Sequence, residues 1–478
     1  MLFPSFRRAF MLALTVLLVV CISFGPAFSS VLSEKLAAYV ESSGAASSAD
    51  VSVYVSDSRG NVIFERNSKK PMAPASNLKI LTTASALRYL GPEYRYCTSI
   101  YGTPIDEKRG VMEGSLYLVG SGDPTFCEPF MDNPTSVFED FAKELAKKGL
   151  RRFTGDIIGD DSVFDREFTG LGWKDSYILD AYAAQCAGLS LNANLVQITL
   201  GYGFVSFVPD CSIISVNDMT VEGGYTDVKV SRKKGTNDVT VKGVKSPWDN
   251  GGATITVHNP SLFSLDAFEK VLRSQCIYNG GATRLIPEID SRYKYSEFVE
   301  LARHESPNMI EILIPMMKES DNLLAQHIFK TVGAEVAGKG SLETSRKAVL
   351  DMLSEAGVST DGIVIADGCG LSPLNRISTS QIGSLLASML SDKNSKLFLS
   401  TMPVSGVDGT LKYRMPDLNV WAKTGTIAGC SALSGYVVTV DGDTAVFSII
   451  SNNHSLGSSV YKGFEDAVVD IIAKTGIR

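Results

Sequence analysis

The sequence predicts a mixed α/β (α+β) domain that is interrupted by an inserted domain, which itself carries a smaller β unit. Residues 50–67 alternate apolar and polar side chains on both sides of a glycine-bearing turn, a pattern typical of a β-hairpin. Amphipathic helical patterns begin near residue 306, and strand patterns return in residues 419–453. The simplest arrangement is one domain whose last strands share a sheet with the hairpin.

The inserted region differs in pattern from its flanks. Between about residues 95 and 290, short strand-like runs are separated by Gly, Asn and Asp, with one helix predicted at 136–148. The centre of this region reads as all β. We therefore predict domain I at 31–95 and 290–478, domain II at 96–199 and 257–289, and a nested β-rich domain III at 200–256.

Composition places the chain among globular proteins and argues against nucleic acid as a partner. Its 478 residues, 44% of them hydrophobic, exceed what one core usually serves, so two or three domains are expected. The formal net charge is -7, and the basic run at 232–234 is too short to follow phosphates.

The first thirty residues have the features of a secretory signal peptide. Arg7 and Arg8 precede an apolar run at 11–24, and small residues at 27–29 suit a signal peptidase. The alternatives are an uncleaved membrane anchor, for which the run is short, and a lipoprotein site at Cys21, which the preceding Val disfavours. We expect a periplasmic or extracellular protein, and loose membrane association stays open.

Cysteine and histidine spacing predicts neither a metal site nor a cofactor. The eight cysteines form no CxxC pair, and the four histidines form no HExxH motif. Most of the cysteines are interpreted as small buried hydrophobes. An exported compartment permits disulfides, and Cys186 with Cys211 is one conceivable pair.

The stretch PASNLKI, residues 74–80, places a nucleophile beside a base. Its apolar pattern predicts that a helix begins near Ser76, so Lys79 lies one turn on and on the same face. A serine hydroxyl needs such a base, and burial can keep the lysine amine neutral. The same S-x-x-K spacing occurs at Ser231, Ser291 and Ser459, so it is not diagnostic alone.

Two further motifs make a chance occurrence improbable. Ser320-Asp321-Asn322 lies between helical patterns, where Asp321 would otherwise be a helix cap. Lys423-Thr424-Gly425-Thr426 lies in a strand pattern, where Lys423 would otherwise be a solvated residue. Ser-x-x-Lys, Ser-Asp-Asn and Lys-Thr-Gly in this order are the signature of penicillin-binding proteins and serine β-lactamases.

The whole mature chain resembles the class C low-molecular-mass penicillin-binding proteins, D-alanyl-D-alanine carboxypeptidases and endopeptidases of the penicillin-binding protein 4 type. The resemblance includes GSGDPT (120–125), GLSLNAN (188–194), DGCGLSPLNRIS (367–378) and the insertion of roughly 240 residues between the first two motifs. One departure is Ala193, where the family usually has an acidic or amide residue. The resemblance implies a transpeptidase/β-lactamase-like domain with an antiparallel sheet flanked by helices, plus two nested inserted domains.

The resemblance also implies roles for the motif residues. Ser76 would attack the carbonyl between two D-alanines, and Lys79 would accept its proton. Ser320 and Lys423 would pass a proton to the leaving amine, and Asn322 would hold the substrate amide. The Lys423-Thr424-Gly425-Thr426 strand would bind the terminal carboxylate, and the backbone N–H groups of Ser76 and Thr426 would form the oxyanion hole.

The implied partners are peptidoglycan stem peptides and β-lactam antibiotics. A β-lactamase and a non-catalytic wall-binding protein are the alternatives, disfavoured respectively by the large insertion and by the intact motifs. Endopeptidase activity and a homodimer stay open. Asp175 and Asp180 are hypothesised to recognise the free amine of a diamino acid in the stem peptide, although ordinary surface acids are the favoured interpretation.

Overall fold

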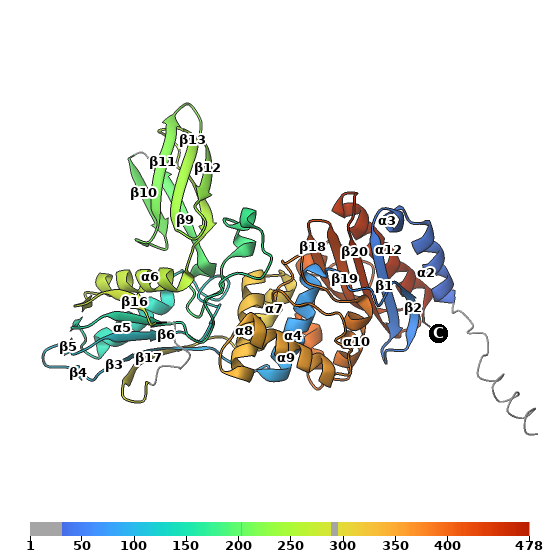
Figure 1. The fold of residues 1–478 in the computed structure, drawn as a ribbon, viewed down its shortest axis with the longest axis horizontal. Coiled ribbons are helices and arrows are strands. Elements are labelled where there is room, and N and C mark those ends of the chain that lie inside the picture. Colours follow the sequence, from blue (N-terminus) through green and yellow to red (C-terminus); the bar gives the residue numbers. More distant parts are fainter. Residues whose placement is uncertain (1–30, 202, 288–294, 478) are drawn as a thin grey trace, which may run out of the picture.

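The computed structural model describes residues 31–201, 203–287 and 295–477, so the predicted signal peptide lies outside the described residues. Its largest domain is built on a five-stranded antiparallel sheet in the order β18-β19-β20-β1-β2 (Figure 1). The strands are β1 (Asp50–Asp57), β2 (Val62–Arg66), β18 (Val420–Ile427), β19 (Cys430–Val438) and β20 (Thr444–Asn452).

Pairing of the first strand with the last one closes this domain. β1 lies antiparallel to β20 from Asp50 opposite Asn452 to Asp57 opposite Ala445. This confirms that the terminal strands share a sheet with the hairpin. The polar residues of β1 do not face solvent, although the alternating pattern suggests that they would. Six of the eight residues of β1 are buried, because helices cover both faces of the sheet.

Helices flank the sheet as expected. On one face, α2 (Val31–Ser42), the short α3 (Gly44–Ser47) and α12 (Ser458–Thr475) enclose a core with the sheet. On the other face lies a larger helical core, in which α4 is central (Figure 1). Its helices are α4 (Lys79–Tyr89), α7 (Met309–Lys318), α8 (Asn322–Ala337), α9 (Leu342–Glu355), α10 (Thr379–Leu390) and α11 (Ser395–Thr401).

The region between α4 and α7 forms a separate body with its own core. A five-stranded sheet, β16-β8-β6-β3-β17, packs with two helices beside a small four-stranded sheet, β15-β7-β5-β4. The elements are β3 (Cys97–Gly102), β4 (Ile105–Asp106), β5 (Val111–Met112), β6 (Leu116–Val119), α5 (Ser136–Lys147), β7 (Arg152–Phe153), β8 (Ile157–Asp160), α6 (Pro260–Ser274), β15 (Tyr278–Asn279), β16 (Thr283–Leu285) and β17 (Val299–Glu305).

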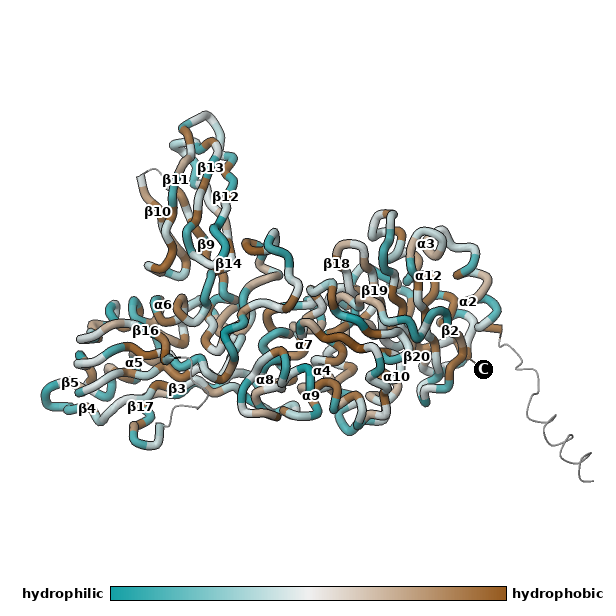
Figure 2. The backbone as a smooth tube through the Cα atoms, in the orientation of Figure 1, coloured by the Kyte–Doolittle hydropathy of each residue, from teal (hydrophilic) through white to brown (hydrophobic). Residues whose placement is uncertain are grey.

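A β-rich arm projects from this body between β8 and α6 (Figure 1). It consists of two three-stranded sheets, β10-β9-β14 and β11-β13-β12. Figure 2 shows hydrophilic and hydrophobic residues in turn along the arm, whereas hydrophobic residues gather around α4. The strands are β9 (Leu195–Gly201), β10 (Phe204–Val208), β11 (Ser215–Glu222), β12 (Asp227–Arg232), β13 (Asp238–Lys245) and β14 (Gly251–Thr256).

The domain limits given above stay a prediction, and β17 bears on one of them. This strand runs past the expected return near 290 and pairs with β3 in the sheet of the inserted body. The suggested disulfide is not formed, because Cys186 and Cys211 are both free and buried in different clusters. Within the described residues, no helix has the length and hydropathy that a membrane crossing requires.

Asp123, in the GSGDPT loop, is a buried carboxylate whose charge is poorly compensated. One of its oxygens accepts hydrogen bonds from the backbone N–H (2.9 Å) and the hydroxyl (2.7 Å) of Thr125. The other oxygen is buried and has no hydrogen-bond partner in the described part of the chain. Burial raises the pKa of Asp123 from 3.8 to about 6.

We expect Asp123→Asn to stabilise the protein above pH 6. The Asp123 carboxyl holds its proton more tightly in the folded state than in the unfolded state. The stability that the protonated carboxyl contributes is therefore lost as the pH rises from about 4 to about 6. Removing the charge should raise the free energy of unfolding by about 3 kcal/mol at pH 7.5 and by much less at pH 4. Urea unfolding at both pH values measures this, with exposed Asp132→Asn as the control. An equal effect at both pH values would contradict the assignment.

Candidate active site

Ser76 lies in a short 3-10 turn, η1 (Ala75–Leu78), that leads directly into α4. One helical turn separates Ser76 from Lys79, and the Lys79 Nζ lies 3.0 Å from the Ser76 Oγ. A glycine of the DGCG loop fixes the start of this turn: at Gly370, with φ +88°, an added Cβ would lie 1.9 Å from the carbonyl oxygen of Ala75. The predicted nucleophile and base therefore meet because a helix that is buried from Lys79 to Leu87 begins at this point.

Lys79 is completely buried, and among the described residues its amine has three hydrogen-bond partners, none of them an acid. The Nζ donates to the Ser76 Oγ (3.0 Å), the Asn322 Oδ1 (2.7 Å) and the backbone oxygen of Cys369 (2.8 Å). Burial lowers the pKa of Lys79 below its ordinary value of 10.5. The loss of solvation therefore favours the neutral amine that a general base needs.

The Ser-Asp-Asn motif lies in the bend between α7 and α8. Ser320 adopts a left-handed backbone conformation, φ +62°, which costs about 1 to 3 kcal/mol for a residue other than glycine. Asp321 caps α8 by accepting a hydrogen bond from the Leu324 N–H at 2.8 Å. Asp321 is thus a helix cap, which is the structural role that the sequence analysis gave as the alternative to a catalytic motif. Asn322 turns its side chain toward Lys79 and donates its Nδ2 to the backbone oxygen of Tyr182 at 2.8 Å.

Lys423 lies on β18, the edge strand of the sheet beside η1. Its side chain is completely buried, and its Nζ donates to the Ser320 Oγ and to the backbone oxygen of Thr424, each at 2.9 Å. Burial, and then the charge of Lys79, lower the pKa of Lys423 well below its ordinary value. Lys423 is therefore no solvated strand residue.

A cavity of about 560 Å³ brings the motif residues together. Ser76, Ser320, Asn322 and Thr426 all line it, whereas Thr424 does not and pairs its hydroxyl with that of Thr410 at 2.8 Å. The remaining lining comes from residues that the sequence analysis did not predict as part of the site: Tyr177, Tyr182, Leu371, Ile427, Ala428, Gly429, His454 and Ser458.

The two acids hypothesised to read a substrate amine do not line this cavity. Asp175 forms an ion pair with Lys234 at 2.6 Å, and Asp180 accepts a hydrogen bond from the Tyr182 hydroxyl at 2.7 Å. The tyrosines beside them do line it, and their rings meet edge to face at 5.4 Å. The inserted body therefore contributes aromatic rings, and not carboxylates, to the site.

The arrangement has the parts of a serine acyl-transfer site. A hydroxyl touches a buried amine, and a second hydroxyl touches a second buried amine across the same cavity. Within the described residues, no group of three or more His, Cys, Asp or Glu side chains is placed to hold a metal ion.

Comparisons with known proteins agree on one family. The model of the D-Ala-D-Ala carboxypeptidase 3 (S13) family matches residues 32–475. A D-alanyl-D-alanine carboxypeptidase from Actinomadura sp. (strain R39) is 33% identical over 430 residues, which is 84% of this chain and 77% of that protein. The D-alanyl-D-alanine carboxypeptidase DacB of Haemophilus influenzae is 26% identical over 421 residues, 84% of each chain.

Solved structures show the same fold. Penicillin binding protein 4 (dacB) from Haemophilus influenzae matches with a TM-score of 0.78 and 24% identity over 92% of this chain and 99% of that chain. A structure of that protein complexed with a β-lactam matches with a TM-score of 0.74. This chain belongs to the D-Ala-D-Ala carboxypeptidase 3 (S13) family.

Proposed function

We propose that Ser76 is the nucleophile of a D-alanyl-D-alanine carboxypeptidase that acts on peptidoglycan stem peptides. The contact of the Ser76 Oγ with the buried Lys79 amine, inside a cavity shared with Ser320 and Thr426, is the observation that carries this proposal. Family membership supports the reaction class, and the geometry supports the residue roles.

In the acylation step, neutral Lys79 accepts the Ser76 proton as the Oγ attacks the carbonyl between the two D-alanines. The N–H groups of Ser76 and Thr426 face the developing oxyanion, each contributing about 3 kcal/mol. Ser320, in contact with Lys423, relays the proton that Lys79 accepted to the departing amine of D-alanine, so both lysines end the step as they began it. Water then attacks the acyl-enzyme, returns a proton to Ser76 and releases the shortened peptide.

The position of Asn322 supports a role for the inserted body in this chemistry. Its amide group joins the Lys79 amine on one side to the Tyr182 carbonyl on the other. Tyr177 and Tyr182 form one wall of the cavity, a feature that suits a peptide substrate larger than an antibiotic. This favours a carboxypeptidase over a β-lactamase, and cleavage of D-alanyl cross-links at the same site is the proposed second activity.

We also propose export to the periplasm or cell exterior, with cleavage of the signal segment, because the substrate lies there. Domains I, II and III are proposed with the limits given above. Loose association with the membrane surface and a homodimer are also proposed.

Covalent attachment of a β-lactam should require the Ser76 hydroxyl. We expect incubation with benzylpenicillin to add one penicilloyl mass to the wild type and none to Ser76→Ala, as measured by intact-protein mass spectrometry. The matched control is Ser85→Ala in the following helix α4, which removes a buried hydroxyl that has no hydrogen-bond partner among the described residues. D-Alanine release from a pentapeptide should follow the same order. Fast turnover of a chromogenic β-lactam would instead identify a β-lactamase.

The pH dependence of acylation should report the buried amines. We expect the rate to rise with pH as the Lys79–Lys423 pair loses a proton, with a midpoint below the ordinary lysine pKa of 10.5. Lys79→Arg places a group there that stays protonated and cannot act as a base, and it should slow acylation about 10² to 10⁴-fold at each pH. Stopped-flow acylation from pH 5 to 10 measures both. A Lys79→Arg profile that matches the wild type would contradict the assigned base.

Ser320→Ala should separate the second proton path from the first. We expect release of D-alanine to fall about 10² to 10⁴-fold, because the leaving amine loses its proton donor. Acylation by benzylpenicillin should fall less, since the nitrogen released by ring opening stays tethered in the site. Steady-state assays with a pentapeptide and acylation assays compare the two. Equal losses in both assays would remove the special role of Ser320 toward the leaving amine.

A further inference from the structure

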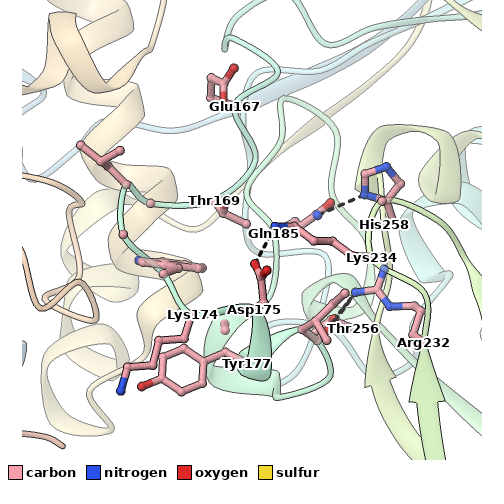
Figure 3. A pocket seen from close by; sticks show the side chains of 17 residues that line it. Glu167, Thr169, Lys174, Asp175, Tyr177, Gln185, Arg232, Lys234, Thr256 and His258 are labelled. Carbon is pink, nitrogen blue, oxygen red and sulfur yellow. Dashed lines mark hydrogen bonds and ion pairs between the residues drawn. The ribbon is translucent and has the colours of Figure 1, made fainter.

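A second cavity, of about 390 Å³, lies behind the wall of the catalytic cavity. It is bounded by the segment 167–178 of the inserted body and by the ends of two strands of the arm, β12 and β14 (Figure 3). Tyr177 lines both cavities. The two cavities are therefore neighbours that share the Tyr177 side chain as part of their lining.

Arg232, the last residue of β12, brings an uncompensated charge to the second cavity. The residue is 8% exposed, and the three hydrogen bonds that its side chain makes within the described residues all go to neutral oxygens. The Nη1 donates to the Thr236 backbone oxygen (3.1 Å), and the Nη2 donates to the backbone oxygen of Ile178 (2.7 Å) and the Thr256 Oγ1 (2.9 Å). The buried Nε has no acceptor in the described part of the chain.

The other charged groups of the cavity do not compensate Arg232. Asp175 is already paired with Lys234, and Glu167 lies at the opposite end of the cavity from Arg232 (Figure 3). Lys174 at the rim adds a further positive charge. Burial, and then the charge of Arg232, lower the pKa of His258, which keeps that ring neutral at pH 7. Within the described residues, neither acid that lines this cavity forms an ion pair with Arg232.

We propose that the second cavity binds a free carboxylate of a peptidoglycan stem peptide, with Arg232 as its anchor. A guanidinium is suited to a planar carboxylate, and one hydrogen of the Arg232 Nη1 has no acceptor among the described residues. The inference rests on the proposed function for the identity of the polymer. The second cavity adds a binding site remote from the scissile bond. Because of this site, the protein binds an intact wall strand more tightly than a short peptide.

The test uses the full chain carrying Ser76→Ala, so that ligand is not consumed. Calorimetric titration with a cross-linked muropeptide dimer should give about tenfold or greater weakening in the added Arg232→Gln variant. Amidation of the other carboxylates of the dimer, with the C-terminal D-alanine carboxylate left free for the catalytic cavity, should weaken binding to the parent by a similar factor and leave Arg232→Gln unaffected. Lys242→Gln, which removes an exposed charge from β13, should bind as the parent does. Equal affinity for the carboxylated and the amidated dimer in the parent would overturn the proposal.

Two controls keep this test independent of folding and of activity. The preference for carboxylate over amide is a ratio within one variant, so a general loss of stability does not change it, and Arg232→Lys should retain part of it. Inorganic phosphate binding as tightly as the dimer would overturn the assignment to a carboxylate. If the wild type releases no D-alanine while the Ser76→Ala protein still prefers the carboxylated dimer, the proposed function fails and this inference stands.

Discussion

The site depends on one interaction, the burial of the Lys79 amine among Ser76, Asn322 and the Cys369 carbonyl. Lys79 and Asn322 are 243 positions apart, so the fold must bring a remote bend onto the first helix before the base has its surroundings. The helical core around α4 does this, because α8 packs directly on α4 and carries Asn322 at its first position. The packing of the whole domain offsets the unfavourable free energy of removing the Lys79 amine from water. The buried amine in turn has a lowered pKa and loses its proton readily.

Helix α8 also ties the inserted body to the catalytic centre. Along its length, Asn322 bonds the Tyr182 carbonyl, His327 contacts the Ser190 hydroxyl at 2.9 Å, and Lys330 forms a buried ion pair with Asp165 at 2.6 Å. These contacts fix the segment that carries the wall tyrosines. The insertion is therefore more than an appendage on a catalytic domain, because it supplies one side of the cavity and one partner of the residue that orients the base.

Local patterns predict the parts of this protein that are locally determined. The β1–β2 hairpin and the Ser76–Lys79 turn follow from alternation and helical periodicity within fewer than twenty residues, and the three motifs follow from their order. The patterns do not predict α12, because the apolar residues of this helix are buried only through its packing on the five-stranded sheet. Nor do they reveal Tyr177 or His454 as lining residues, because these positions meet Ser76 only through contacts between distant elements. The disulfide suggested for Cys186 failed for the same reason, since spacing carries no information about which cores enclose the two thiols.

Three buried basic residues of this fold have different roles, and the difference follows from the chemistry of their side chains and partners. Lys330 is buried and forms an ion pair with Asp165, which makes it a structural link. Lys79 is buried without an acid, and an ammonium in that position can shed its proton, which makes it a base. Arg232 is also buried without an acid, but burial lowers its pKa only to about 10, so it stays charged at neutral pH. A lysine can resolve an unpaired charge by becoming neutral, whereas an arginine resolves it by acquiring an anion. The same lack of a counterion therefore indicates catalysis at one position and ligand binding at the other.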